Sequence, residues 1–197
     1  MLFADAPVLS NEHVELRPLS VEHHDELVEA VSVDELWRTW YTRIPSPTGM
    51  AEEIRRRVLA MAAGTLAAWT IFDPRTGHAV GMTTYLNLDP ANRRLEIGST
   101  WLSRSVQGGL VNPAAKLLLL ERAFDQLDCI AVEFRTHWHN RQSRAAIAKL
   151  GAKQDGVLRN HSIFGNGTVR DTVVFSIIDG EWPTVRYGLE QRLASRG

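Results

Sequence analysis

The sequence predicts an α/β (α+β) fold with one mixed, mostly antiparallel central sheet and helices on both faces. The first observation behind this class is that strand-like and helical segments alternate along the chain. The second is a run of three strand-like segments with short links, over 66–72, 79–88 and 95–102, which is typical of an antiparallel meander. The third is the strand-like segment 130–136, which follows a crossover helix and therefore makes the sheet mixed.

The first third of the chain contains one strand and three helical segments. Ser20 is a good N-cap for the first helix, and Gly64 is a suitable stop for the last. Pro45 and Pro47 cannot continue a helix and mark a loop. The predicted elements are a strand at 14–19 and helices at 21–31, 34–41 and 48–64.

The last part of the chain carries clear local signals. Asn112 is a good N-cap, and Pro113 fits the first helical position. Asn140 is a second N-cap, with Gly151 as the stop of its helix. The triplet 165–167 (Gly-Asn-Gly) is a hairpin signal. The predicted elements are helices at 113–127, 140–150 and 181–193 and strands at 130–136, 157–164 and 168–178.

Length and composition favour a single domain, 1–197, with residues 1–12 as an N-terminal extension. The 22 Lys and Arg residues balance the 23 Asp and Glu residues, which argues against a nucleic-acid-binding or lipid-binding surface. Cys129 is the single cysteine, so an internal disulfide is impossible and a cytoplasmic location is expected. No run of residues has the length and apolarity of a membrane span.

The segment around the glycine pair Gly108–Gly109 predicts an anion site. The pair ends a strand-like run, and a long apolar helix follows. The start of a helix presents free backbone N–H groups at the positive end of the helix dipole, and phosphates bind there.

Four stretches of the sequence form a recognisable set: 95–102 (LEIGSTWL), 107–116 (QGGLVNPAAK), 140–152 (NRQSRAAIAKLGA), and 157–159 together with 170–172. In this order they resemble the GNAT superfamily of N-acetyltransferases, in particular the Rim-type ribosomal-protein N-terminal acetyltransferases. The similarity covers most of the chain from Val14 onward. The resemblance implies a GNAT fold in which the fourth and fifth strands splay apart around acetyl-CoA.

The resemblance implies a cofactor site formed by the fourth strand, the glycine loop and the next helix. The family loop commonly has glycine at its fourth position, where this chain has Leu110; that departure affects how closely the backbone approaches a phosphate. The implied cofactor-binding residues are Trp101, Leu102, Gln107, Gly108, Gly109, Leu110, Val111, Asn112 and Asn140.

The implied catalytic residues are Glu96 and Ser143. Strand alternation places Glu96 on one face with Gly98 and Thr100. A carboxylate in a half-buried strand can act as general base, often through water; the alternative is a surface glutamate paired with Arg93 or Arg94. Ser143 would protonate the leaving thiolate, whereas the structural alternative is that Asn140 and Ser143 only cap a helix.

Aromatic residues follow the first helix, where the family's substrate loop begins. Trp37, Trp40 and Tyr41 are therefore candidate substrate-binding residues, and His161 is a fourth, on the terminal hairpin. The alternatives are ordinary core packing for the tryptophans and a salt-bridged hairpin around His161. His137 and His139 flank Trp138 without the spacing of a zinc site, so no metal is expected.

These observations favour an acetyl-CoA-dependent N-acetyltransferase that acts on a primary amine, either a protein N-terminus or a small molecule, by direct attack in a ternary complex. A catalytically silent GNAT-like module that binds CoA or a partner remains the alternative, and Leu110 is its main support. A dinucleotide-binding domain is disfavoured because the loop lacks the Gly-x-Gly-x-x-Gly pattern. The sequence leaves open whether the protein is a monomer or a homodimer.

Overall fold

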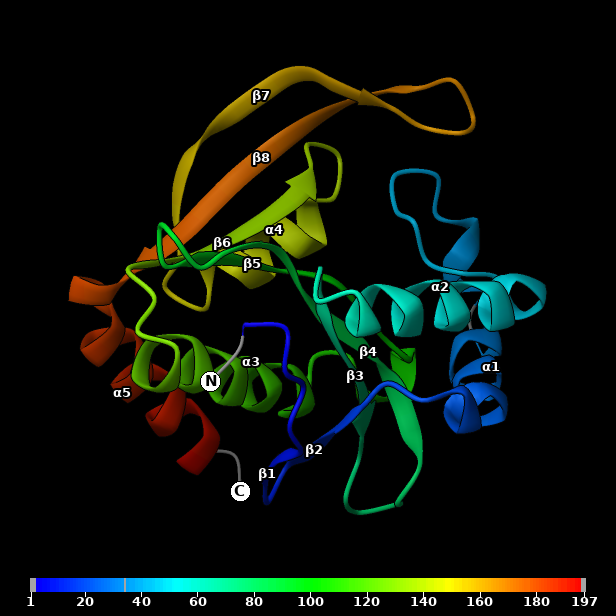
Figure 1. Cartoon of the computed structure of the whole chain (residues 1–197), viewed down its shortest axis with the longest axis horizontal. Coiled ribbons are helices and arrows are strands. Elements are labelled where there is room, and N and C mark those ends of the chain that lie inside the picture. The colour runs from blue at the N-terminus through cyan, green and yellow to red at the C-terminus, as the bar shows by residue number, and fades with distance from the viewer. Residues whose placement is uncertain (1–2, 34, 196–197) are drawn as a thin grey trace.

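The computed structural model describes residues 3–33 and 35–195 and shows an open eight-stranded sheet in the order β1-β2-β3-β4-β5-β6-β8-β7 (Figure 1). The strands are β1 (Leu9–Asn11), β2 (Val14–Pro18), β3 (Ala67–Phe72), β4 (Ala79–Asp89), β5 (Arg94–Leu102), β6 (Ala131–His137), β7 (Lys153–Ile163) and β8 (Val169–Ile178). The α-helices are α1 (His24–Ser32), α2 (Met50–Ala62), α3 (Val111–Glu121), α4 (Arg141–Ala148) and α5 (Trp182–Ala194). The short helical turns are η1 (Val21–His23), η2 (Leu36–Arg38), η3 (Pro47–Gly49), η4 (Arg104–Val106), η5 (Arg122–Gln126) and η6 (Asp179–Glu181).

The strand pairing confirms the predicted mixed sheet. The run β3–β4–β5 is an antiparallel meander, and β5 and β6 are the parallel pair that α3 connects. The hairpin of β7 and β8 turns at the predicted glycines: Gly167 has φ +81°, and the Phe164 N–H donates to the Thr168 carbonyl at 2.9 Å. The positive φ is a conformation that glycine adopts without steric cost.

The helices cover both faces of the sheet, as predicted (Figure 1). Helices α1 and α2 pack on one face, where Leu27, Met50 and Met82 belong to a common buried cluster. Helices α3, α4 and α5 pack on the other, and the larger buried cluster there includes Leu119 and Leu189. Because successive strand residues point to opposite faces, the central strands β3, β4 and β5 contribute to both clusters.

Strand β1 lies within the segment expected to be an N-terminal extension. Leu9 pairs with Leu16 of β2, and the Trp69 indole N–H donates to the Pro7 carbonyl at 2.8 Å. This part of the segment is therefore bonded to the sheet. Residues 1–2 lie outside the described residues.

The helix predicted over 34–41 is reduced to the single turn η2, so that prediction was wrong in extent. Glu35 has φ +48°, and Thr39 is extended with ψ 108°. Neither conformation continues an α-helix, and a β-branched threonine loses rotamer freedom in one. Asp34, the first residue of the predicted helix, lies outside the described residues. Trp40 and Tyr41 consequently belong to the loop between α1 and α2.

Strands β5 and β6 are the fourth and fifth strands expected from the sequence, because β1 adds one strand before them. They splay apart, as expected for this fold. Their register contains three pairs, Arg94 with Ala131, Leu95 with Val132 and Glu96 with Glu133. Beyond these pairs β5 continues to Leu102, and β6 continues to His137. Beyond Glu96, the last part of β5 forms no ladder pairs with β6, so Glu96 lies at the point where the strands diverge.

A β-bulge interrupts β5 just beyond this point. Ser99 has φ +46°, and the register between β4 and β5 shifts between Met82 and Thr84. A bulge inserts one residue and reverses the alternation of faces after it. Thr100 consequently points to the α3 side, where its Oγ1 lies 2.8 Å from the Nζ of Lys116. The prediction that Thr100 shares a face with Glu96 and Gly98 was therefore wrong.

Candidate active site

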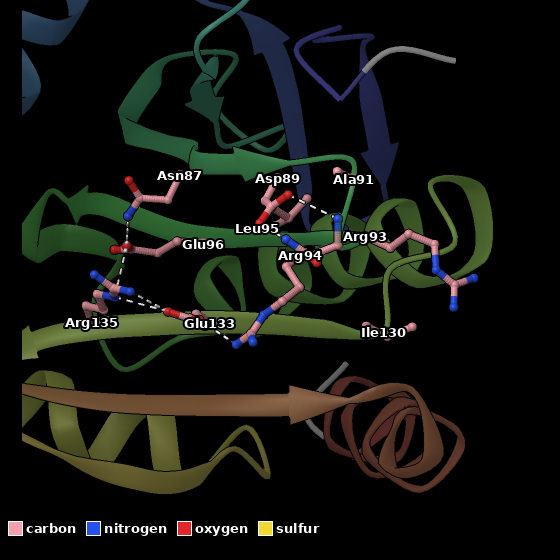
Figure 2. Close-up of a pocket in the computed structure, with 11 residues that line it drawn as sticks. Asn87, Asp89, Ala91, Arg93, Arg94, Leu95, Glu96, Ile130, Glu133 and Arg135 are labelled. Atoms are coloured by element: carbon pink, nitrogen blue, oxygen red, sulfur yellow. Dashed lines mark hydrogen bonds and ion pairs between the residues drawn. The ribbon is translucent and has the colours of Figure 1, made fainter.

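Glu96 is buried on the face of the sheet that carries α1 and α2, with 7% of its surface exposed. Asn87 Nδ2 donates to its Oε2 at 2.7 Å, and the Nε of Arg135 lies 3.6 Å from the same oxygen (Figure 2). Burial raises the pKa of Glu96 above its usual range, while Arg135 and Asn87 oppose the rise. A raised pKa brings a carboxyl group closer to the range in which a general base works at neutral pH.

The alternative pairing with Arg93 or Arg94 is not found. Arg93 contacts Asp128, and Arg94 Nη2 lies 2.6 Å from Glu133 Oε1. Glu96 is thus held by an amide and a more distant guanidinium, and it keeps one oxygen, Oε1, outside these contacts.

Gly98 keeps the space beside Glu96 open. A Cβ atom at this position would lie 2.7 Å from Glu96 Oε1 and 3.0 Å from Leu86 Cδ1. Real Cβ atoms do not approach oxygen so closely, so a larger residue would displace the carboxylate. The Leu-Glu-Ile-Gly sequence therefore places a buried acid and the room that it needs on the same face of β5.

A shallow hollow of about 710 Å³ lies over this face at the start of β5 and β6 (Figure 2). Its floor is charged: Arg94 and Arg135 both pair with Glu133, at 2.6 and 2.8 Å. Figure 2 shows Glu96 and Arg135 at one end of the hollow. The residues that line it are Asn87, Asp89, Ala91, Asn92, Arg93, Arg94, Leu95, Glu96, Ile130, Glu133 and Arg135.

A cluster of aromatic rings lies at the far end of β6. Trp40 contacts His137 and His139, with ring centroids 5.4 Å apart in both pairs, and Tyr41 lies 6.2 Å from His137. Phe164, from the hairpin of β7 and β8, lies 5.5 Å from His137. Three segments that are distant in sequence therefore form one wall, which contains two of the four predicted substrate-binding residues.

The other two predicted substrate-binding residues lie elsewhere. Trp37 is half-buried and packs against the core under α1 and α2. His161 is exposed on β7, and its Nδ1 lies 3.0 Å from Thr172 Oγ1. Sequence reasoning missed Phe164, because a phenylalanine beside a glycine turn has the pattern of an ordinary strand end.

His137 is buried and held in one orientation. Its Nδ1 accepts the backbone N–H of His139 at 3.1 Å, so the proton of the neutral ring is assigned to Nε2. Burial lowers the pKa of His137, and Arg170 and His139 lower it further. Across the described residues, Nε2 has no hydrogen-bond partner, and no group of three His, Cys, Asp or Glu side chains could hold a metal.

The loop between β5 and α3 leads into a helix start, as predicted, but the N-cap is a different residue from the predicted one. Helix α3 begins at Val111 with Leu110 as N-cap, so Asn112 is the second helical residue and the predicted N-cap was wrong. Leu110 already has helical dihedral angles (φ −89°, ψ −16°), and its carbonyl accepts the Ala114 N–H at 3.0 Å, so the helix starts before Asn112. The backbone N–H groups of Leu110, Val111 and Asn112 lie at the start of the helix, where no preceding turn supplies a carbonyl acceptor.

Leu110 departs from the family loop, and its side chain packs against the larger core. Because that side chain packs toward the core, the backbone carries the outward face of the loop. Gly108 has φ +76°, and an added Cβ there meets nothing within 4 Å, so the loop is open on this side. The arrangement fits a phosphate group held by backbone N–H groups.

The remaining cofactor candidates on β5 and in the loop after it are Gln107, Trp101 and Leu102. Gln107 Nε2 donates to the Leu102 carbonyl at 2.8 Å, and Gln142 Nε2 donates to Gln107 Oε1 at 3.1 Å. These bonds connect the end of β5 with α4. Trp101 and Leu102 place their side chains in opposite buried clusters, so only their backbone can face a ligand.

A model of the acetyltransferase (GNAT) domain family matches residues 13–153. The chain belongs to the GNAT family of acetyltransferases. YdaF of Bacillus subtilis (strain 168), whose name proposes ribosomal N-acetyltransferase activity, is 28% identical over 87% of this chain and 94% of its own.

Two solved structures share the fold. A GCN5-related N-acetyltransferase from Brucella melitensis has 27% identity and a TM-score of 0.87, covering 95% of this chain and 85% of its own. RimJ of Mycobacterium smegmatis, in complex with CoA-disulfide, has 21% identity and a TM-score of 0.82, covering 100% of this chain and 98% of its own. Within the described residues of the acetyltransferase, no helix is long and apolar enough to cross a membrane.

The start of α4 separates the two interpretations of Ser143. Asn140 is the N-cap, and its Oδ1 accepts the backbone N–H of Ser143 at 3.0 Å. The cap thus uses the side chain of Asn140 and only the backbone of Ser143. Removing the Ser143 hydroxyl therefore leaves the cap intact.

Ser143→Ala is expected to lower the single-turnover rate of acetyl transfer, while the free energy of unfolding changes by no more than about 0.5 kcal/mol, as for a surface substitution. The matched variant Asn140→Ala is expected to lose about 1 kcal/mol of stability, because it removes the cap itself. A rapid-quench experiment beside a thermal melt measures both. An unchanged rate in Ser143→Ala would contradict its role as acid. Tyr41 would then be the candidate, since Tyr85 is fully buried and donates to the Leu119 carbonyl.

Proposed function

We propose that this acetyltransferase moves an acetyl group from acetyl-CoA to a primary amine by direct attack in a ternary complex. The observation that carries the proposal is the splay of β5 and β6, with the buried Glu96 at its base. Acetyltransferases of the GNAT family use acetyl-CoA, and RimJ of Mycobacterium smegmatis, which shares the fold, holds a CoA disulfide.

The cofactor is proposed to lie along the free part of β5. Backbone groups between Gly98 and Leu102 would pair with the pantetheine arm as an added strand does. The pyrophosphate would bind at the N–H groups of Leu110, Val111 and Asn112, where the helix dipole is positive. Asn140, at the start of α4, would contact the arm from the other side of the splay.

Glu96 and Ser143 supply the proton transfers in this proposal. Glu96 accepts a proton from the amine, directly or through one water, and the neutral nitrogen attacks the thioester carbon. The C–N bond forms, the C–S bond breaks, and the departing thiolate takes a proton from the Ser143 hydroxyl. A proton released by the amine restores that hydroxyl. Such positioned groups typically contribute about 10²–10⁴-fold to a rate.

A screen of amines and N-terminal peptides with acetyl-CoA, read as free CoA thiol, tests the proposal. An enzyme of this class releases thiol in proportion to the acetylated amine, and mass spectrometry identifies the product. Binding of acetyl-CoA without thiol release from any amine would favour the silent CoA-binding module instead. The partly buried Leu110 side chain packs against the core, which supports catalysis over that alternative.

Gly108→Val is expected to weaken acetyl-CoA binding at least about tenfold, because a β-branched residue resists φ +76° and shifts the N–H groups that follow. Calorimetric titration of the folded variant measures the change. Gly77→Val is the matched control, since Gly77 has φ +73° in the turn between β3 and β4. It should lose stability without losing affinity. Equal affinities in all three proteins would place the phosphate site elsewhere.

A further inference from the structure

Two arginines flank Phe164 at the aromatic wall. The guanidinium of Arg43, from the loop between α1 and α2, lies 4.8 Å from the centroid of the Phe164 ring. The guanidinium of Arg170, from β8, lies 5.8 Å from the same centroid. Arg170 is partly buried, and its Nε donates to Thr172 Oγ1 at 2.8 Å, which fixes its direction. A loop and a strand thus bring two positive charges to one ring.

These two arginines have no carboxylate partner, in contrast to their neighbours on the same face. Arg94 and Arg135 pair with Glu133, and Arg135 also lies 3.6 Å from Glu96. In the described part of the chain, neither Arg43 nor Arg170 forms an ion pair. Glu133 and Asp171 already pair with other arginines, whereas Glu52, which lines a second hollow together with Arg43, forms no ion pair in the described residues. Two arginines against this single carboxylate leave the wall with a net positive charge.

The pKa of Arg170 agrees with this imbalance. Burial lowers it, and the charges of Arg43 and Arg135 lower it further, while Glu96 acts in the opposite direction. The charge of Arg170 therefore interacts with both Arg43 and Glu96. An anion bound between Arg43 and Arg170 would relieve the repulsion between the two guanidinium groups.

We propose that the amine acceptor carries an acidic group close to its reactive nitrogen, and that Arg43 and Arg170 bind this group. The inference rests on the proposed function, because it assumes that the amine meets Glu96. A guanidinium presents planar pairs of donors that match a carboxylate, and the contact is strongest where water is partly excluded. The acceptor class is an amino acid or an N-terminal peptide with a carboxylate in its first residues.

The test compares pairs of acceptors that differ only in charge. One pair is an N-terminal peptide with Glu or Gln at its second position; the other is a free amino acid and its amide. The acidic member is expected to have a higher kcat/KM by about tenfold or more, mainly through KM, with the preference falling as salt rises. If the peptide pair differs and the amino-acid pair does not, the acidic group belongs to a peptide chain; the reverse result indicates a small molecule.

Arg170→Gln and Arg43→Gln are expected to remove this preference by slowing the acidic acceptor and leaving the neutral one nearly unchanged. Arg43 is exposed, so its variant folds even if the Arg170 variant does not. Arg159→Gln is the control, because Arg159 is exposed on β7 and pairs with Asp171 at 2.5 Å. Equal kcat/KM for both members of each pair in the parent enzyme would overturn the inference. Failure to acetylate any amine would instead overturn the proposed function.

Discussion

Glu96→Gln is expected to lower turnover by about 10²–10⁴-fold at neutral pH, with little change in acetyl-CoA affinity. The amide has the shape of the carboxylate, and its oxygen can still accept the hydrogen bond of Asn87. What it lacks is the ability to take a proton from the amine. A steady-state rate together with a calorimetric titration of acetyl-CoA measures the two effects separately.

The pH profile provides a second readout. Burial raises the pKa of Glu96, so the base becomes active only as the pH rises through that elevated value. The wild-type rate should increase across this range, and the glutamine variant should lack the increase. Burial of a charged carboxylate also costs free energy that glutamine does not, so the variant should be at least as stable at neutral pH.

Glu15→Gln is a suitable control for this experiment. Glu15 is another strand glutamate, on β2, and it pairs with Arg17 at 2.7 Å. Its variant should keep both the rate and the pH profile. If Glu96→Gln also keeps the wild-type rate at every pH, the proton leaves by another route and Glu96 is not the base.

The parts of the fold that the sequence predicts are those determined by local interactions. Asn140 caps α4 by accepting the backbone N–H of the residue three positions along, and Gly167 allows the hairpin turn because glycine adopts its φ of +81° without steric cost. Likewise, the short links of the meander leave its strands no arrangement but antiparallel pairing. The general position of the cofactor loop and the acid on β5 follow from the family resemblance.

The missed features depend on contacts between distant segments. Nothing near Ser99 signals a bulge, because the bulge is set by how β5 pairs with β4 and by the bond from Thr100 to Lys116 on α3. Helix α3 likewise begins at Val111, whose side chain is buried in the larger core, and not after the better capping residue Asn112. The wall at Phe164 forms only where the loop between α1 and α2, the end of β6 and the turn of the β7–β8 hairpin meet, which no local pattern encodes.

Lys116 is the clearest case of a residue whose behaviour only the fold reveals. It lies on α3 with 5% of its surface exposed, and its Nζ contacts Thr100 Oγ1 at 2.8 Å and Thr83 Oγ1 at 3.5 Å. No carboxylate pairs with it in the described residues. Burial lowers the pKa of Lys116 to about 7. The two threonine hydroxyls are also 2.8 Å from each other, so they remain bonded without the lysine.

Lys116→Met is expected to stabilise the protein by a few kcal/mol at pH 7, because each pKa unit of depression corresponds to about 1.4 kcal/mol. Methionine fills similar volume and needs no proton partner. Between pH 7 and about 10.5 the unfolded state binds more protons than the folded state, so wild-type stability rises with pH relative to the variant. The gain should therefore shrink as the pH rises. Urea unfolding at both ends of this range measures it, and Lys149→Met, at an exposed site, should show no such trend. A gain that does not change with pH would mean that Lys116 keeps its charge in the folded state.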